Sequence, residues 1–146
     1  MMGQKIRLTG DEMRCTALFE SITSANITDC IIDKERDRVI MVVKGGEAGL
    51  AIGKGGARVK LLSDLIKKDV EIVEYDDDSI NFIKKSFNPA KIKEVKITER
   101  QDGKKIALVT VEDRYKGIAI GKNGRTIERT RFLAKRYFQI DNVIIV

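Results

Sequence analysis

The chain has 146 residues, enough for one ordinary domain or two small ones, and its 42% apolar fraction can build a core. No apolar run is long enough to span a membrane, and the opening residues MMGQKIRLTGDEM lack a secretory signal. The chain has no histidine, which removes the most common general base and most zinc sites, and Cys15 and Cys30 lack metal-ligand spacing. We therefore expect a cytoplasmic, non-enzymatic protein without a metal ion or cofactor.

The positive charge of the chain is concentrated in its second half. The net charge of the whole chain is +6. Residues 1–76 contain 12 Lys and Arg against 13 Asp and Glu, whereas residues 77–146 contain 16 against 9, a net charge of +7. Such an excess is typical of a surface that binds nucleic acid, although a well-solvated surface has the same composition. Composition alone does not separate these two interpretations.

The first half of the chain has the pattern of a helix, a β-hairpin, two helices and a closing strand. The expected elements are a helix over about 9–24, strands over 27–33 and 38–43, a short helix over about 47–51, a helix over about 57–68 and a strand over 70–75. Thr9 is the expected N-cap of the first helix, because Glu12 follows three residues later. The apolar residues of the 57–68 helix are expected in the core; they are Val59, Leu62, Leu65 and Ile66.

The second half repeats this order after the acidic stretch YDDDS at 75–79, so we expect two domains, residues 1–76 and residues 77–146. The expected elements are a helix over about 79–87 that stops before Pro89, strands over 92–99 and 104–111 around the turn Gln101-Asp102-Gly103, a short helix, a helix over about 125–137 and a strand over 141–146. In the 125–137 helix, Ile127 and Leu133 are expected in the core.

Sliding the sequence against itself gives one register of 68 residues. In this register LAIGKGGA at 50–57 falls on IAIGKNGR at 118–125, and the strand VIMVV falls on ALVTV. The match continues downstream in residue type, without a gap, as far as Ile72 and Ile140. A match that runs through strand, loop and helix indicates a repeated structural unit.

Each copy of the Gly-Lys-x-Gly loop joins two predicted helices. Glycine reaches positive φ at low cost and lets another backbone come close, and the helix that follows presents unpaired N–H groups and its positive dipole end. A phosphate fits this environment, with Lys54 or Lys122 beside it and Arg58 or Arg125 extending the positive rim. The apolar residue before each loop would support the loop or the wall of a groove. These two residues are Ile52 and Ile120.

Two other kinds of site fit the sequence less well. A nucleotide-binding P-loop needs GxxxxGK and then Ser or Thr, but Ala48 and Lys116 stand where its first glycine belongs. Gly55 and Asn123 follow the lysines in place of Ser or Thr. The acidic run at 76–78 offers ligands for Mg²⁺, but neighbouring residues at a domain junction rarely converge on one ion, and a solvated or helix-capping run is the more ordinary interpretation.

The two loops, IGKGG and IGKNG, each between two helices after a β-hairpin, resemble the GxxG loop of KH domains. The element order resembles the type II KH topology. The implied fold is α+β: two tandem type II KH domains, each helix-strand-strand-helix-helix-strand, with a three-stranded mixed sheet covered by helices on one face. The close coupling of two such units is similar to the tandem KH module of NusA proteins. Because the chain lacks room for the other domains of bacterial NusA, it resembles the compact archaeal NusA-like proteins.

The resemblance implies that the GxxG loops clamp single-stranded RNA by its backbone. The residues expected to contact RNA are Ile52, Gly53, Lys54, Gly55, Gly56, Arg58, Ile120, Gly121, Lys122, Asn123, Gly124 and Arg125. KH grooves are commonly aliphatic, and the aromatic content here is 5%, which favours hydrogen bonds and aliphatic packing over base stacking. The loop at 121–124 lies in the half with the net positive charge, so we expect it to bind RNA more tightly than the loop at 53–56.

The favoured function is that of a single-stranded RNA-binding transcription factor in termination or elongation control. RNA polymerase is then the expected protein partner, and two fused units favour a monomer. A ribosomal or ribosome-assembly KH protein needs the same clamp, so the loop chemistry leaves that alternative open. A protein-interaction adaptor for RNA polymerase, in which the KH folds serve as scaffolds without RNA, also stays open.

Overall fold

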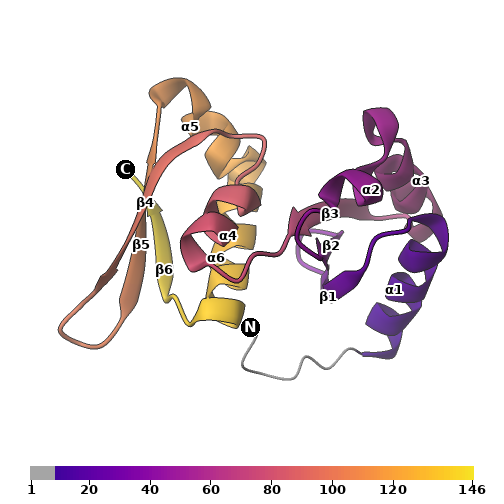
Figure 1. Ribbon diagram of the computed structural model, residues 1–146, viewed down its shortest axis with the longest axis horizontal. Coiled ribbons are helices and arrows are strands. Elements are labelled where there is room, and N and C mark those ends of the chain that lie inside the picture. The colour runs from indigo at the N-terminus through magenta and orange to yellow at the C-terminus, as the bar shows by residue number, and fades with distance from the viewer. Residues whose placement is uncertain (1–8) are drawn as a thin grey trace. The chain divides into compact units, whose positions relative to one another are not determined.

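The computed structural model of the chain describes residues 9–146, so the expectation about a secretory signal partly concerns residues outside the described part. The described residues divide into two compact units, one ending at Asp76 and the other beginning at Asp77. Each unit contains one three-stranded mixed sheet together with its helices, so the predicted α+β fold class is confirmed (Figure 1).

The first unit has the predicted element order. Its elements are α1 (Gly10–Ile22), β1 (Ile27–Asp33), β2 (Arg38–Val43), α2 (Ala48–Ile52), a short 3₁₀ turn (Lys54–Gly56), α3 (Ala57–Ile66) and β3 (Asp69–Glu74). Strand β2 is central, antiparallel to β1 and parallel to β3. All six residues of β2 are buried.

The second unit repeats this order. Its elements are α4 (Ser79–Ser86), β4 (Ile92–Glu99), β5 (Lys105–Val111), α5 (Asp113–Ile120), a 3₁₀ turn (Lys122–Gly124), α6 (Arg125–Phe138) and β6 (Asn142–Ile145). The central strand β5 is antiparallel to β4 and parallel to β6. In Figure 1, α4 and α6 lie on one side of this sheet. The Gly-Lys-x-Gly loop lies between α5 and α6, in the connection from β5 to its parallel neighbour β6. The sheet topology therefore determines where this loop lies in the unit.

The start of α1 is set by a capping box, as predicted. The Glu12 backbone N–H donates to Thr9 Oγ1 over 3.2 Å, and the Thr9 N–H donates to Glu12 Oε1 over 2.8 Å. These bonds satisfy donors that the first helical turn leaves unpaired. The cap fixes the end of a helix that places Phe19, fully buried, in the core of the first unit.

The prediction that Leu65 lies in the core is wrong, because its side chain is 53% exposed. The buried face of α3 is centred on Leu62, with Val59 and Ile66 partly buried against the core, and Leu65 projects to one side of it. The predictions for Ile127 and Leu133 are confirmed, since both are buried.

Helix α6 has a wider buried face than α3, and α4 packs against part of it. The rings of Phe82 and Tyr137 meet edge to face with centroids 5.5 Å apart, and the Ser86 and Thr130 hydroxyls are hydrogen-bonded at 2.9 Å. Leu133, at the α6 position that corresponds to Leu65 in α3, is fully buried.

The ungapped repeat register fails after the loop helices. Met41 pairs with Ile72 in the first sheet, and its counterpart Val109 pairs with Ile145 in the second. Ile72 therefore corresponds to Ile145, not to Ile140 as the sequence register implied. The reason is that α6 has 14 residues and α3 has 10, so the second unit reaches its last strand later.

A buried cation ties the three strands of the first sheet together. Arg38 on β2 is 2% exposed, and its Nε donates to Asp33 Oδ2 on β1 over 2.9 Å. Its Nη1 donates to Glu71 Oε1 on β3 over 3.1 Å. A buried guanidinium is tolerated only when it is paired in this way.

We expect Arg38→Leu to lower the free energy of unfolding by about 3 kcal/mol, because two partly buried carboxylates lose their shared partner. Urea unfolding followed by circular dichroism measures the change. Lys34→Ala, which removes an exposed cation from the neighbouring turn, is the control and should change stability by less than about 0.5 kcal/mol. Equal stability of the two variants would contradict the assigned role of Arg38.

Candidate nucleic-acid interface

The two Gly-Lys-x-Gly loops have nearly the same backbone conformation. The first glycines, Gly53 and Gly121, have φ/ψ of 78/171° and 79/167°. The third positions are both left-handed, with φ of 63° at Gly55 and 56° at Asn123. The last glycines have φ of 78° and 75°. A repeated conformation with positive φ at three of the four loop positions indicates a shared structural requirement.

The first glycine of each loop lies against the helix that follows. A Cβ on Gly121 would lie 2.5 Å from Thr126 Oγ1 and 2.8 Å from the Thr126 backbone N. A Cβ on Gly53 would lie 2.8 Å from Arg58 Cγ and 3.1 Å from the Arg58 backbone N. Only glycine permits this approach, and the approach folds the loop tightly over the start of α3 or α6.

The helices after the loops begin without a side-chain cap. Gly56 and Gly124 are the N-caps of α3 and α6, and no side chain accepts a hydrogen bond from either first turn. In contrast, Thr9 caps α1 and Asp78 caps α4. The Ala57 and Arg125 N–H groups donate to the Lys54 and Lys122 carbonyl oxygens. The positive ends of the α3 and α6 dipoles still face the loops without a side-chain cap, so they can attract an anion such as a phosphate.

Each loop carries one exposed lysine beside this helix end. Within the part of the chain that the structure describes, neither the Lys54 nor the Lys122 side chain has a hydrogen-bond or ion-pair partner. The next residues, Gly55 and Asn123, are exposed as well. The lysines are therefore free to pair with a bound phosphate without first breaking a contact in the protein.

The two predicted arginines differ in what they do. Arg58 is half-buried, and its Nη1 donates to the Leu50 carbonyl oxygen over 2.6 Å, so it ties α3 back to α2 and supports the loop. Arg125 is the first residue of α6, one position earlier in the repeat, and Thr126 stands where the first unit has Arg58. The rim cations of the two loops are thus placed differently.

Apolar residues flank both loops. Ile120 is 42% exposed, while Ile52 is half-buried, and between each of them and the preceding exposed residue lies a fully buried alanine. The preceding residues, Leu50 and Ile118, are also exposed and were not among the predicted contacts. The repeated apolar triplets LAI and IAI in the sequence could have indicated these two residues. Together these side chains form an apolar border next to each polar loop.

Neither a metal-binding cluster nor a membrane-spanning helix is found among residues 9–146. No three Asp, Glu or Cys side chains lie close enough together there to hold a metal ion. In the acidic run, Asp78 Oδ2 accepts from the Asn81 backbone N–H over 3.0 Å, which is the helix-capping role considered for this run. None of the described helices has the length and apolar character that a membrane crossing requires.

Comparisons with known proteins agree with this architecture. Residues 14–85 match the KH domain family, and residues 79–144 match the NusA-like second KH domain. The chain is similar in fold to the crystal structure of APE1850, with a TM-score of 0.82 and 38% identity over 95% of this chain and 100% of that one.

Curated relatives cover nearly the whole chain. It is 38% identical to the probable transcription termination protein NusA of Halobacterium salinarum, over 94% of this chain and 96% of the relative. It is 33% identical to the protein of the same name from Methanocaldococcus jannaschii, over 97% of this chain and 76% of the relative. The transcription termination/antitermination protein NusA of Mycobacterium tuberculosis is 35% identical over 53% of this chain and only 22% of its own length.

We expect Gly121→Ala to destabilise the second unit by about 2 kcal/mol or more, because the added Cβ combines positive φ with a clash against Thr126. Gly55→Asn is the matched control: Asn occupies the equivalent left-handed position at 123, and nothing lies within 4 Å of a Cβ there. Its effect should be below about 1 kcal/mol. Thermal melts followed by circular dichroism make the comparison, and equal effects would contradict the close-approach argument.

We expect Cys30 to be unreactive in the folded protein, because burial raises the pKa of its thiol to about 12. The raised pKa favours the folded state while the thiol is protonated, so this contribution is lost as the pH rises from about 9 toward 12. A Cys15→Ala variant treated with Ellman's reagent at pH 8 should react slowly when native and rapidly in urea. Fast labelling of the native variant would contradict this prediction.

Proposed function

The chain belongs to the NusA-like family of tandem KH proteins, and on this premise we propose that it is a single-stranded RNA-binding factor acting in transcription termination or elongation. We propose residues 1–76 and 77–146 as its two RNA-binding domains. The observation that carries the proposal is the pair of loops with the same left-handed backbone, each ending at an uncapped helix N-terminus beside an unpaired lysine.

In this proposal the loop backbone and the first-turn N–H groups bind phosphates, and the lysines add charge. The bases lie against the apolar border of each loop. The proposed contacts of the first domain are Ile52, Gly53, Lys54, Gly55, Gly56 and Arg58, with Arg58 acting through its support of the loop. Those of the second domain are Ile120, Gly121, Lys122, Asn123, Gly124 and Arg125.

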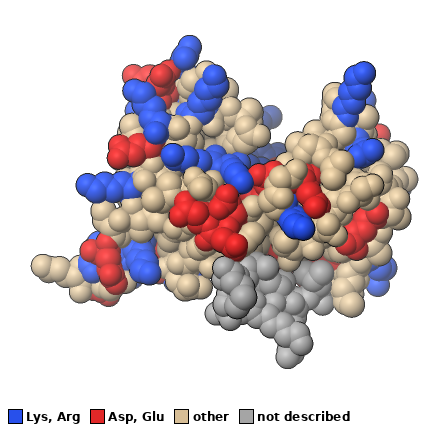
Figure 2. Space-filling model, viewed as in Figure 1, with Lys and Arg blue, Asp and Glu red and all other residues tan. Residues whose placement is uncertain are grey.

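The two domains would contribute unequally to binding. Residues 77–146 carry the whole excess of positive charge, a net +7. On the face shown in Figure 2, Lys and Arg side chains gather over the part of the second unit where α5 lies. Because phosphate contacts supply most of the non-specific affinity for nucleic acid, the second domain is proposed to bind RNA more tightly.

RNA polymerase is the proposed protein partner, in line with the transcription termination proteins that the chain resembles. The proposed mode of action is binding and positioning of nascent RNA, with no chemical step. A ribosome-associated KH protein or a polymerase adaptor without RNA would use the same fold. Affinity purification from native lysate, scored for polymerase subunits against ribosomal subunits, distinguishes the proposed function from that of a ribosome-associated KH protein.

We expect Lys122→Asp/Asn123→Asp to weaken binding of a short single-stranded RNA at least tenfold, because it places two carboxylates where a phosphate would lie. Lys54→Asp/Gly55→Asp should have a smaller effect. Asp tolerates the left-handed conformation, so both variants should keep the fold. Fluorescence anisotropy over a range of salt concentrations gives the affinity and the salt slope.

The matched control is Lys93→Asn/Lys96→Asp, which makes the same change in net charge at two exposed residues of β4. If this control weakens binding as much as the loop variants, the effect is one of overall charge, and the loops are not the site. If both loop variants bind RNA as the unmodified chain does, the clamp proposal fails and the adaptor function is favoured.

A further inference from the structure

Resting on the proposed function, we infer that the second domain has a base-stacking site on α6, formed by Phe132 and Arg136, for an unpaired base of the RNA held at the 121–124 loop. The aliphatic groove expected from composition would thus be supplemented at one position by an aromatic contact.

Phe132 is unusual in its exposure. Its side chain is 47% exposed, and no other aromatic side chain among residues 9–146 is as open to solvent. It contributes to the lining of a shallow hollow of about 480 Å³, whose lining residues are Glu128, Arg131, Phe132, Lys135 and Arg136. An exposed aromatic ring among cations is the composition that single-strand binders use to stack bases.

Arg136 is already positioned over the ring. Its guanidinium carbon lies 5.9 Å from the ring centroid of Phe132, within the range of a cation–π contact. A base stacked on the ring would therefore lie beside a positive charge that attracts its phosphate.

Two further cations of the hollow, Arg131 and Lys135, are bonded within the fold. Arg131 donates from Nε to the Val143 carbonyl oxygen over 3.0 Å and from Nη1 to Glu128 Oε1 over 2.6 Å. Lys135 Nζ donates to Asp141 Oδ1 over 2.6 Å. These bonds tie the rim to β6 and to the turn before it, so the ring stands on a firm support.

The site lies on the face of α6 that starts at the loop. Arg125, Phe132 and Arg136 are spaced at i, i+7 and i+11, which places them on one face of a helix. Phe132 is about 10 Å along the axis from Arg125, the first residue after the loop. A KH loop holds about four nucleotides, so a strand leaving it along this stripe reaches the ring.

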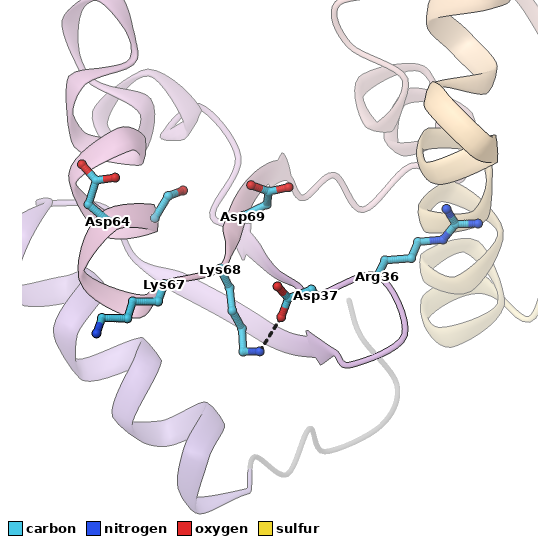
Figure 3. A pocket seen from close by; sticks show the side chains of 7 residues that line it. Arg36, Asp37, Asp64, Lys67, Lys68 and Asp69 are labelled. Carbon is cyan, nitrogen blue, oxygen red and sulfur yellow. Dashed lines mark hydrogen bonds and ion pairs between the residues drawn. The ribbon is translucent and has the colours of Figure 1, made fainter.

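The first domain provides an internal contrast. The residues equivalent to Arg125, Phe132 and Arg136 are Ala57, Asp64 and Lys68. Lys68 Nζ is paired with Asp37 Oδ1 at 2.7 Å, as Figure 3 shows. The hollow there, of about 300 Å³, is lined by three aspartates, three cations and a serine, and it has no aromatic residue on which a base could stack. The stacking site is therefore specific to the second domain.

We expect Phe132→Ala to weaken binding of the full chain to a single-stranded RNA of about ten nucleotides on the order of tenfold, the loss typical of one stacked base. Phe132→Tyr should bind nearly as well as the unmodified chain, and Phe132→Leu should resemble Phe132→Ala, because it keeps apolar area without an aromatic face. The salt slope should not change in Phe132→Ala and should fall in Arg136→Ala, which removes a charge.

The matched control is Leu65→Ala, which shortens another exposed apolar side chain, in the first domain. It should leave affinity unchanged. RNAs with 2-aminopurine at successive positions identify the stacked base, since its fluorescence is quenched on an aromatic ring. Quenching should occur at one position and be lost in Phe132→Ala. Thermal melts check that each variant is folded.

The outcomes separate this inference from the proposed function. If Lys122→Asp/Asn123→Asp loses RNA and Phe132→Ala does not, the clamp stands and the stacking site is wrong. If the unmodified chain does not bind RNA, both fail. If Phe132→Ala keeps RNA affinity but loses purified RNA polymerase, the ring contacts protein, and the stacking site is again overturned.

Discussion

The close approach of Gly53 and Gly121 to the helix that follows is the constraint on which the proposed site depends. Each glycine leaves its helix with a hydrogen bond to the carbonyl four residues earlier, at 3.0 Å and 2.9 Å, and then turns directly over the next helix. No side chain fits in that turn. The turn leaves the following helix N-terminus without a side-chain cap, so the steric requirement for glycine and the proposed affinity for an anion have the same origin.

The same backbone is given different surroundings in the two units. In the first unit, Arg58 holds the loop, and the hollow near the end of α3 is lined by aspartates and cations. In the second unit, Thr126 stands in place of Arg58, and Arg125 is the first residue of α6. The outer face of α6 carries an aromatic ring among cations. The repeat thus keeps the geometry of the turn proposed to bind phosphate and varies the side chains around it.

Sequence patterns were sufficient for the fold because local signals were strong and agreed with one another. The capping pair Thr9 and Glu12, the hairpin turns and the glycine loops each specify local geometry. The exposure of Leu65 was not predictable, because helical periodicity places it beside the core face and only the packing of neighbouring helices decides how wide that face is. The role of Arg58 depends on the Leu50 carbonyl oxygen, a backbone contact that residue types do not encode.

The break in the repeat register bears directly on the stacking site. Helix α3 ends at Ile66, and the left-handed Lys67 turns the chain so that Lys68 pairs with Asp37. Helix α6 continues to Phe138, which keeps Arg136 helical, one turn after Phe132. Only a continuous helix brings residues four apart onto one face, so the additional turn is what places the guanidinium over the ring. The greater length of α6, which also shifts the strand pairing, therefore accounts for a proposed stacking site that the first unit lacks.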